Sequence, residues 1–251
     1  MISALMVTQP GRETLSRISM MDFARQDHPH RELVVVHDGR ADHHRRLTAM
    51  ASRFSRDLIR VVHTGPGQTL GALRNLAVQS ALGEYVCQWD DDDRHHPQRL
   101  AIQWNALQEH QGEACFLCDQ LHLFVKTAEL YWDDWTAEAY PFNLVQGTIM
   151  ARRECLPAYR DIGRGEDTQL LIDLLEKEAR ICRVKGAGWC YVYVHHDSNV
   201  WSEGHHRAIS RAKALGPAAL LQRYAMLKKR LSEYEPPLGP VRLVSSQGTL
   251  F

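Results

Sequence analysis

The chain has 251 residues, with 30 basic and 30 acidic side chains and a formal net charge of zero. This length accommodates one large α/β domain, or one domain with a tail, around a sizeable core. The balanced charge excludes the whole-chain basic field that favours nucleic acid, so no nucleic-acid partner is expected. No apolar run reaches the roughly 18–20 residues that a membrane-spanning helix needs.

The N-terminus starts directly with an apolar, strand-like segment and has no basic region before it. We therefore expect no signal peptide and a cytoplasmic location. The six cysteines are accordingly expected to be reduced thiols. Cys115 and Cys118 form a C-x-x-C, but they enclose an apolar pair and no second C-x-x-C follows. A buried strand is therefore favoured over a zinc or redox site.

In the first hundred residues, short apolar runs alternate with segments of helical periodicity. The expected strands are 2–8, 33–36, 58–62 and 85–89, and helical patterns cover 15–21, 48–54, 70–81 and 97–109. This alternation predicts a mostly parallel sheet with helices on both faces. Ligands bind beyond the carboxyl ends of strands in such sheets. Thr8, Asp38 and Asp90 all fall at such ends.

The second half of the chain is less regular. Residues 116–125, 147–151 and 189–195 are predicted as strands, 131–135 as a turn or hairpin, and 167–178 as a helix. Residues 204–233 are helical in pattern and carry a basic patch at 228–230, and the chain from Pro236 onward is expected to be a loose tail. A solvated helix is the simpler interpretation of the basic patch, and peripheral contact with the inner face of a membrane, or with a partner, is the alternative.

Four aspartates, Asp90 to Asp93, directly follow the fourth predicted strand. Adjacent carboxylates repel one another and need a counter-charge. In an extended backbone Asp90 and Asp92 point to one side, which suits a hard divalent ion, Mg²⁺ or Mn²⁺, that also takes phosphate oxygens. A solvated acidic turn is the alternative. Asp93 is expected to support the loop.

Residues 71–93 resemble the most distinctive stretch of family 2 glycosyltransferases of the GT-A fold: a helix with Arg-Asn, then Ala-x-Gly-Glu-Tyr, an apolar strand and Asp-x-Asp-Asp. Asp90 and Asp92 take the Asp-x-Asp positions, with Asp91 between them. The resemblance, which covers about residues 1–200, implies an α/β GT-A fold, whose Rossmann-like, mostly parallel central sheet is flanked by helices. To this the chain adds a C-terminal helical extension.

We accordingly predict a GT-A domain over residues 1–203 and a helical extension with a tail over 204–251. Within the domain, residues 1–110 form the nucleotide-binding half and residues 111–203 the acceptor-binding half.

The resemblance also implies a nucleotide-sugar site formed by Thr8, Gln9, Asp38, Arg74, Asp90 and Asp91. Thr8 ends the first strand, where the family contacts the nucleotide. Asp38 lies in a Val-His-Asp-Gly sequence similar to the family's Val-x-Asp-Gly, whose Asp binds the base. Arg40 follows in place of the usual Ser or Thr. Arg74 matches the Arg that approaches the nucleotide or diphosphate, with a surface ion pair as its alternative.

The sequence Gly-Arg-Gly-Glu-Asp at 163–167 opens a predicted helix and is similar to the family's Gly-Glu-Asp motif. The resemblance implies that Asp167 is the general base that takes a proton from the acceptor hydroxyl. Glu166 would orient the acceptor or substitute as the base. Ordinary acidic capping of a helix N-terminus is the alternative.

Residues 191–201 resemble a C-terminal segment of some family members, Tyr-x-Tyr-x-x-His-Gly-x-Asn-x-Trp. His196 matches a His that in some members helps to hold the metal or diphosphate. The implied ligands for Mn²⁺ or Mg²⁺ are therefore Asp92 and His196. Asp197 replaces the usual Gly. His205 and His206 are further candidates, whereas the histidine pairs at 43–44 and 95–96 are expected at the surface.

The implied activity is metal-dependent, inverting transfer of a sugar from a nucleotide-sugar donor, with UDP the commonest nucleotide. The acceptor would be a saccharide or a lipid-linked glycan, as in cell-surface polysaccharide synthesis. A nucleotidyltransferase usually carries a Gly-rich, basic loop after the first strand, where only Gln-Pro-Gly-Arg stands at 9–12. A haloacid dehalogenase-like phosphatase places Asp-x-Asp on its first strand. A non-catalytic nucleotide-sugar-binding or partner-docking domain is the alternative outside enzymes.

Overall fold

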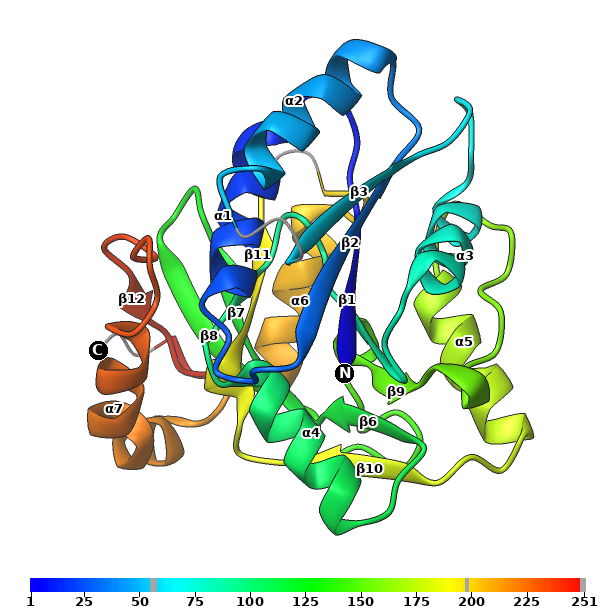
Figure 1. Cartoon of the computed structure of the whole chain (residues 1–251). Coiled ribbons are helices and arrows are strands. Elements are labelled where there is room, and N and C mark those ends of the chain that lie inside the picture. The colour runs from blue at the N-terminus through cyan, green and yellow to red at the C-terminus, as the bar shows by residue number, and fades with distance from the viewer. Residues whose placement is uncertain (55–57, 197–198, 249–251) are drawn as a thin grey trace.

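In the computed structural model, the chain folds into two β-sheets with helices packed against them (Figure 1). The structure describes residues 1–54, 58–196 and 199–248. In the described residues the first sheet runs β10 (Ile181–Val184), β6 (Ala114–Leu117), β9 (Met150–Arg152), β4 (Tyr85–Gln88), β1 (Ile2–Val7), β2 (Arg31–His37) and β3 (Ile59–His63). The second sheet runs β12 (Arg242–Leu243), β8 (Glu129–Asp134), β7 (Asp119–Phe124), β11 (Tyr191–His195) and β5 (Arg94–His95).

The first half forms the parallel part of the first sheet. β1 pairs in parallel with β2 and β4, and β2 pairs in parallel with β3. The connecting helices are α1 (Glu13–Ala24), α2 (Ala41–Ala51) and α3 (Leu70–Ser80). Met6 and Val35 pack with Phe23 of α1, whereas Leu5 on the other face packs with Leu73 of α3. Because helices cover both faces of the sheet, the sequences of these strands are continuous apolar runs. The predicted parallel sheet is confirmed.

The second half connects the two sheets. After α4 (Arg99–Glu109), β6 joins the first sheet and β7 joins the second, so the single strand predicted over 116–125 is wrong. Both strands are buried along their whole length, so the apolar pattern shows no break at Cys118. Of the turn or hairpin predicted at 131–135, the turn is wrong: most of the segment is strand β8, which forms a hairpin with β7 by antiparallel pairing. β9 runs antiparallel between β4 and β6, and α5 (Glu166–Glu176) follows.

The C-terminal segment packs on the second sheet rather than forming one helix and a loose tail. The predicted helix is two helices, α6 (Glu203–Lys213) and α7 (Pro217–Leu231), separated around Gly216. β12 pairs in parallel with β8, and Leu243 and Val244 are buried. Leu227 of α7 belongs to the same apolar cluster as Trp132 of β8. In the described residues, no helix is long and apolar enough to cross a membrane.

The described residues also test the predictions for cysteine and histidine. Cys115 and Cys118 are buried, free thiols, and burial, together with Asp119, raises the pKa of Cys118 to about 11. Three of the histidines predicted at the surface, His43, His95 and His96, are buried instead. Polar partners make their burial tolerable: His43 Nδ1 lies 3.1 Å from the Glu13 carboxylate, and His96 Nε2 lies 2.7 Å from Glu233.

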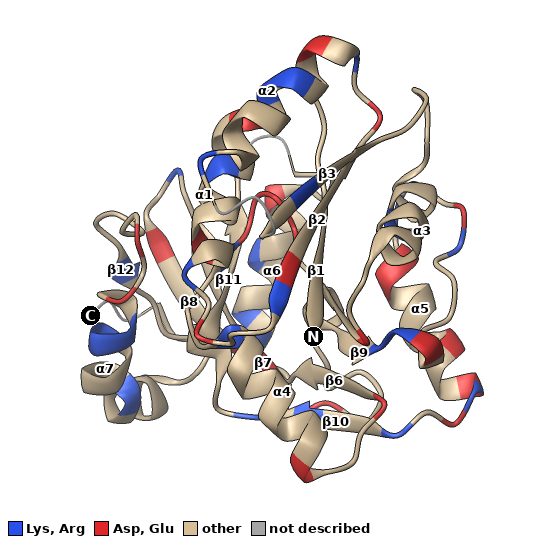
Figure 2. Cartoon of the chain, viewed as in Figure 1, with Lys and Arg blue, Asp and Glu red and all other residues tan. Residues whose placement is uncertain are grey.

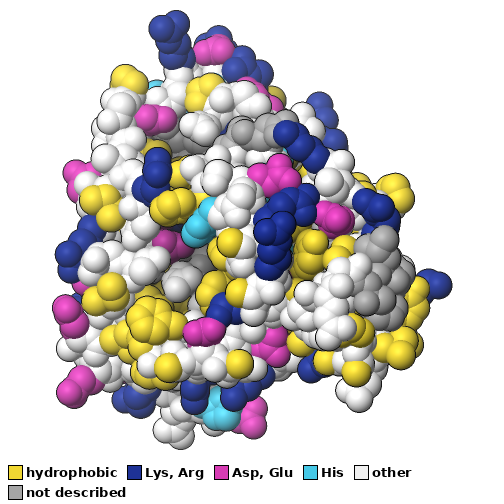
Figure 3. Space-filling model, turned by 180° about the vertical axis from the view of Figure 1, so that it is seen from behind, with side chains coloured by type: hydrophobic (Ala, Val, Ile, Leu, Met, Phe, Trp, Pro, Cys, Tyr) yellow, Lys and Arg dark blue, Asp and Glu magenta, His cyan; other side chains and the backbone are white. Residues whose placement is uncertain are grey.

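Charged residues of both signs are spread over the fold, in the helices beside the first sheet and in the C-terminal part of the chain (Figure 2). On the face seen from behind, basic side chains gather near the centre with acidic ones beside them (Figure 3). This mixture of basic and acidic residues agrees with the formal net charge of zero.

Candidate active site

The aspartate run lies at the carboxyl end of β4, where it lines a cavity of about 200 Å³. The other walls come from distant parts of the sequence: Arg12, Arg74 of α3, residues 163–167 at the start of α5, and residues 199–201 after β11. The structure therefore brings Arg74, Asp90, Asp91, Asp92, Glu166 and Asp167 to one cavity. Its position agrees with the rule that ligands bind beyond the carboxyl ends of parallel strands.

Arg74 joins the end of β4 to the start of α5. Its Nη2 donates to Asp90 Oδ1 at 2.9 Å and its Nε to Glu166 Oε1 at 2.8 Å. Gln88 Nε2 donates to the second Asp90 oxygen at 2.9 Å. Burial alone lowers the pKa of Arg74, but Asp90 and Glu166 outweigh it and raise the net pKa. Arg74 is only 6% exposed, so its ion pairs are buried and the alternative of a surface ion pair is wrong.

Asp91 points inward rather than to solvent and is 2% exposed. The Thr8 hydroxyl at the end of β1 donates to its Oδ2 at 2.6 Å, and Arg12 Nη1 donates to its Oδ1 at 2.8 Å. Burial and the neighbouring Asp92 carboxylate raise the pKa of Asp91 to about 7. Thr8 and Asp91 therefore fix the aspartate run to the end of β1.

Asp92 follows a strand of the first sheet and lines the cavity, and His196, which follows a strand of the second sheet, reaches it from beside the cavity. His196 Nε2 lies 3.1 Å from Asp92 Oδ2, and Arg12 Nη1 donates to the same oxygen at 3.0 Å. Burial acts to raise the pKa of Asp92, but His196 and Arg12 outweigh it, so the net pKa is lowered. The oxygen that would bind a metal ion is thus kept ionised.

The pair of Asp92 and His196 fits a divalent ion that keeps other ligands. A carboxylate oxygen and an imidazole nitrogen are both donors that Mn²⁺ accepts, and these two atoms lie 3.1 Å apart. Among the described residues, no group of three or more His, Cys, Asp or Glu could hold an ion by itself. Mg²⁺ and Mn²⁺ sites of this kind are completed by water and phosphate oxygens.

Asp93 connects the aspartate run to the second sheet. The Tyr191 hydroxyl donates to its Oδ2 at 2.5 Å and the Val194 amide to its Oδ1 at 3.0 Å. Burial, followed by the charge of Asp92, raises the pKa of Asp93 well above its ordinary value. Asp93 therefore supports the loop, as expected from the sequence.

Asp167 lies in the first turn of α5, directly after Glu166. Gly165 precedes the helix with φ at 75°, a conformation that favours glycine. Burial and the adjacent Glu166 carboxylate raise the pKa of Asp167. Its Oδ1 accepts a hydrogen bond from the Thr168 amide at 2.7 Å. A carboxylate of raised pKa that faces a cavity is suited to accept a proton.

The model of the family described as Glycosyl transferase family 2 matches residues 17–156, more than half of the chain. The chain belongs to glycosyl transferase family 2. Residues 71–93, with the four aspartates, lie within this match, whereas Asp167 and the segment 191–201 lie after it. No curated protein matches the chain by sequence.

Solved structures of S. aureus TarS resemble this family 2 chain in fold. TarS 1-349 in complex with UDP-GlcNAc has a TM-score of 0.60 at 15% identity, over 92% of this chain and 66% of that chain. The UDP complex has a TM-score of 0.59 at 15% identity, over 95% and 81%. A longer TarS chain has a TM-score of 0.55 at 18% identity, over 91% and 43%. This chain therefore spans less than half of the longer TarS chain, and the likeness confirms the predicted GT-A fold.

Gln9 and Asp38, predicted on the nucleotide side of this family 2 chain, do not line the cavity. Asp38 Oδ2 accepts hydrogen bonds from the amides of Gly67 at 2.9 Å and Gln68 at 3.2 Å, which connects the end of β2 to the loop before α3. Gln9 is exposed in the turn that leads to Arg12, whose amide donates to its carbonyl at 3.2 Å. Both lie beyond strand ends on the same side of the sheet as the aspartates.

Arg12 and Tyr193 are among the residues of the cavity wall that were not assigned from the sequence. Arg12 belongs to the Gln-Pro-Gly-Arg turn, which carried no clear motif. The Tyr193 hydroxyl lies 3.1 Å from Nε2 of the buried His206, and Asn199 Nδ2 donates to it at 3.4 Å. His205 stacks on Trp201 with ring centroids 4.9 Å apart. Asp197, the departure from the family segment, lies outside the described residues.

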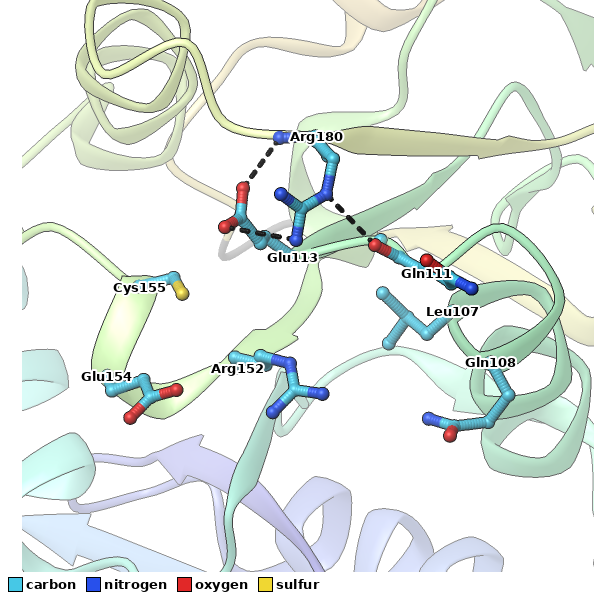
Figure 4. Close-up of a pocket in the computed structure, with 9 residues that line it drawn as sticks. Leu107, Gln108, Gln111, Glu113, Arg152, Glu154, Cys155 and Arg180 are labelled. Atoms are coloured by element: carbon cyan, nitrogen blue, oxygen red, sulfur yellow. Dashed lines mark hydrogen bonds and ion pairs between the residues drawn. The ribbon is translucent and has the colours of Figure 1, made fainter.

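A larger hollow of about 420 Å³ lies near the amino ends of β6 and β10 (Figure 4). Its arginines already have carboxylate partners: Arg152 pairs with Glu84 at 2.8 Å and Arg180 with Glu113 at 3.3 Å. Because ligands of parallel sheets bind at the opposite strand ends, the smaller cavity at the aspartate run is the candidate active site of this family 2 glycosyltransferase domain.

Proposed function

We propose that the chain transfers a sugar from a UDP-sugar to a hydroxyl of a saccharide or lipid-linked acceptor, with a divalent ion and with inversion at the anomeric carbon. One observation carries the proposal. The cavity holds both the carboxylates after β4 and Asp167 at the start of α5, which are the donor and acceptor halves of such a reaction. The UDP and UDP-GlcNAc in the TarS complexes support a UDP donor.

On the donor side, Mn²⁺ or Mg²⁺ held by Asp92 and His196 would supply positive charge against the charge that develops on the leaving nucleoside diphosphate. Arg74 adds a fixed positive charge beside Asp90, because Glu166 holds its guanidinium from the other side. Asp90 is oriented by Gln88 and Arg74 to contact the donor. Asp38 would bind the base, with Thr8 and Gln9 beside the nucleotide.

On the acceptor side, Asp167 takes the proton of the attacking hydroxyl as the new bond forms. Glu166 is bound to Arg74 Nε at 2.8 Å, so we assign it to orientation rather than to proton transfer. With Asp167 as the base and the nucleoside diphosphate as the leaving group, the proposed reaction is a single displacement, which inverts the anomeric carbon.

A panel of sugar nucleotides assayed for transfer and hydrolysis with Mn²⁺ tests the function. We expect Asp92→Ala and Asp167→Asn to lose transfer by at least about 10²-fold while both variants keep the circular dichroism of the wild type. Asp173→Asn is the matched control, because Asp173 lies on the same helix and pairs with Arg160; its activity should stay within about twofold. Full transfer by folded Asp92→Ala protein would overturn the metal assignment.

Titration calorimetry separates the alternative classes. We expect UDP with Mn²⁺ to bind more tightly than CTP or ATP. Preference for CTP or ATP would favour a nucleotidyltransferase, against the family membership. Binding without any transfer, or no binding of nucleoside diphosphate at all, would favour a non-catalytic domain.

We also propose a cytoplasmic location, a domain boundary at residue 203 and, third, contact of the C-terminal helices with the inner face of a membrane or with a partner. The third is supported by Lys228 and Lys229, which are exposed in the last turn of α7, near exposed Leu221 and Met226. We also propose a role in cell-surface polysaccharide synthesis, which requires that the acceptor is a cell-surface glycan or its lipid-linked precursor.

A further inference from the structure

The metal-binding oxygen proposed for Asp92 already has a cation beside it. Arg12 Nη1 donates to Asp92 Oδ2 at 3.0 Å and to Asp91 Oδ1 at 2.8 Å. His196 Nε2 lies 3.1 Å from the same Asp92 oxygen. Guanidinium and imidazole therefore share the atom through which a divalent ion would bind.

The two arginines of the cavity differ in how firmly they are held. Arg74 is nearly buried and bridges carboxylates of two separate elements, Asp90 and Glu166. Moving it would break the connection between the end of β4 and the start of α5, and its own side chain is only 7% exposed. Arg12 is more exposed, at 17% of its side chain, and extends from a turn in which Gly11 has φ at 91°. Asp91 and Asp92, to which it donates, lie next to each other in the aspartate run.

A divalent ion on Asp92 changes the electrostatics of Arg12. The ion neutralises the carboxylate that attracts the guanidinium, and it repels the guanidinium because both are positive. The donor diphosphate then brings negative oxygens to the same place. A guanidinium binds such oxygens with two parallel N–H bonds, which a lysine ammonium cannot reproduce.

We propose that Arg12 is the counter-cation of the metal-free site, that it competes with the divalent ion for Asp92, and that once displaced it binds the diphosphate of the donor. This inference rests on the proposed function. Removal of the Arg12 charge should therefore raise the affinity for the metal ion and lower the affinity for the nucleotide.

Binding measurements on the whole chain test both effects. The probes are Mn²⁺ alone, followed by titration calorimetry or by the electron paramagnetic resonance of free Mn²⁺, and UDP at saturating Mn²⁺. For Arg12→Gln we expect the Kd for Mn²⁺ to fall at least threefold and the Kd for UDP to rise about tenfold, the size of a lost charge-assisted hydrogen bond. Arg12→Lys should restore the Kd for Mn²⁺ but only part of the affinity for UDP.

Arg17→Gln is the matched control, because it removes the same charge from an exposed position on α1, the helix that directly follows Arg12. Both of its dissociation constants should stay within twofold of the wild type. A variant that is only damaged would bind both probes more weakly, so opposite shifts distinguish the proposed role from a structural one.

The inference is overturned if Arg12→Gln binds Mn²⁺ no more tightly than the wild type, or if its affinity for UDP is unchanged. If the wild type binds neither Mn²⁺ nor UDP, the proposed function fails and this inference fails with it. If the wild type binds both and Arg12→Gln does not differ, only the role of Arg12 is wrong.

Discussion

The four aspartates share one sequence pattern but have four different environments. Asp90 is held by Arg74 and Gln88, Asp92 by Arg12 and His196, and Asp93 by Tyr191 and the amide of Val194. Asp91 is buried against Thr8 and Arg12. A carboxylate that is buried beside another carboxylate destabilises the fold when it ionises. This predicts a stability effect that depends on pH.

The pKa of Asp91 is about 7 in the folded, metal-free chain and about 3.9 in an unfolded one. The folded state therefore holds a proton that the unfolded state has lost, and stability falls as pH rises from about 4 to above 7. Each pKa unit corresponds to about 1.4 kcal/mol. In urea unfolding with EDTA, Asp91→Asn should be more stable than the wild type at pH 8.

At pH 5 the wild-type Asp91 carboxyl is mostly protonated in the folded state, and an amide resembles it in shape and neutrality. The gain in the free energy of unfolding from Asp91→Asn should therefore be smaller at pH 5 than at pH 8. An equal gain at both pH values, or a loss at pH 8, would show that Asp91 is an ordinary ionised partner of Arg12.

At the scale of elements, the short strand β12 determines how the C-terminal segment packs. It has two residues, yet it pairs with β8 and places Leu243, 5% exposed, in the apolar cluster beneath α7. Loss of buried Leu contacts costs about 2–4 kcal/mol. We therefore expect Leu243→Ala to lower the free energy of unfolding by that amount, measured by urea denaturation.

Leu221→Ala on α7 is the control for this substitution, because Leu221 is 61% exposed. Its free energy of unfolding should stay within about 0.5 kcal/mol of the wild type. Equal small effects of the two substitutions would mean that the C-terminal segment is the loose tail that its sequence indicates.

The elements of the first half could be predicted because β1, β2 and β4 are apolar runs that end at glycine, proline or aspartate. The passage from β6 to β7 could not, because burial of both strands removes any polar signal at Cys118. The division between α6 and α7 had a signal in Gly216-Pro217 that the long helical pattern concealed. β12 is too short to show a period at all.

In the candidate site, too, some residues could be predicted from the sequence and others could not. Asp92, Asp167 and His196 stood in motifs, and the structure places them around or beside one cavity. Arg12 had no motif, because its role depends on a fold that brings the turn after β1 against the end of β4. The buried histidines were predicted at the surface, because their partners, such as Glu233 for His96, are far away in sequence.

At the scale of the whole molecule, the candidate site lies between the two sheets. Asp92 follows β4 of the first sheet and His196 follows β11 of the second. Asp93 connects the same two strands through Tyr191 and Val194. A metal ion and nucleotide bound at this junction would hold both sheets at once. Ligand binding should therefore stabilise the entire fold rather than a single loop.

Mn²⁺ with UDP at about 100 times its Kd should stabilise the fold by about 2.7 kcal/mol. For a chain of this size, that corresponds to a rise in Tm of roughly 5–11 °C. His196→Ala and Asp92→Ala should each lose most of this rise, whereas His110→Ala, which removes an exposed histidine after α4, should keep it. Thermal unfolding followed by circular dichroism measures the three variants together. A full rise in His196→Ala would mean that the second sheet takes no part in binding the metal and nucleotide, and that the donor is held by the first sheet alone.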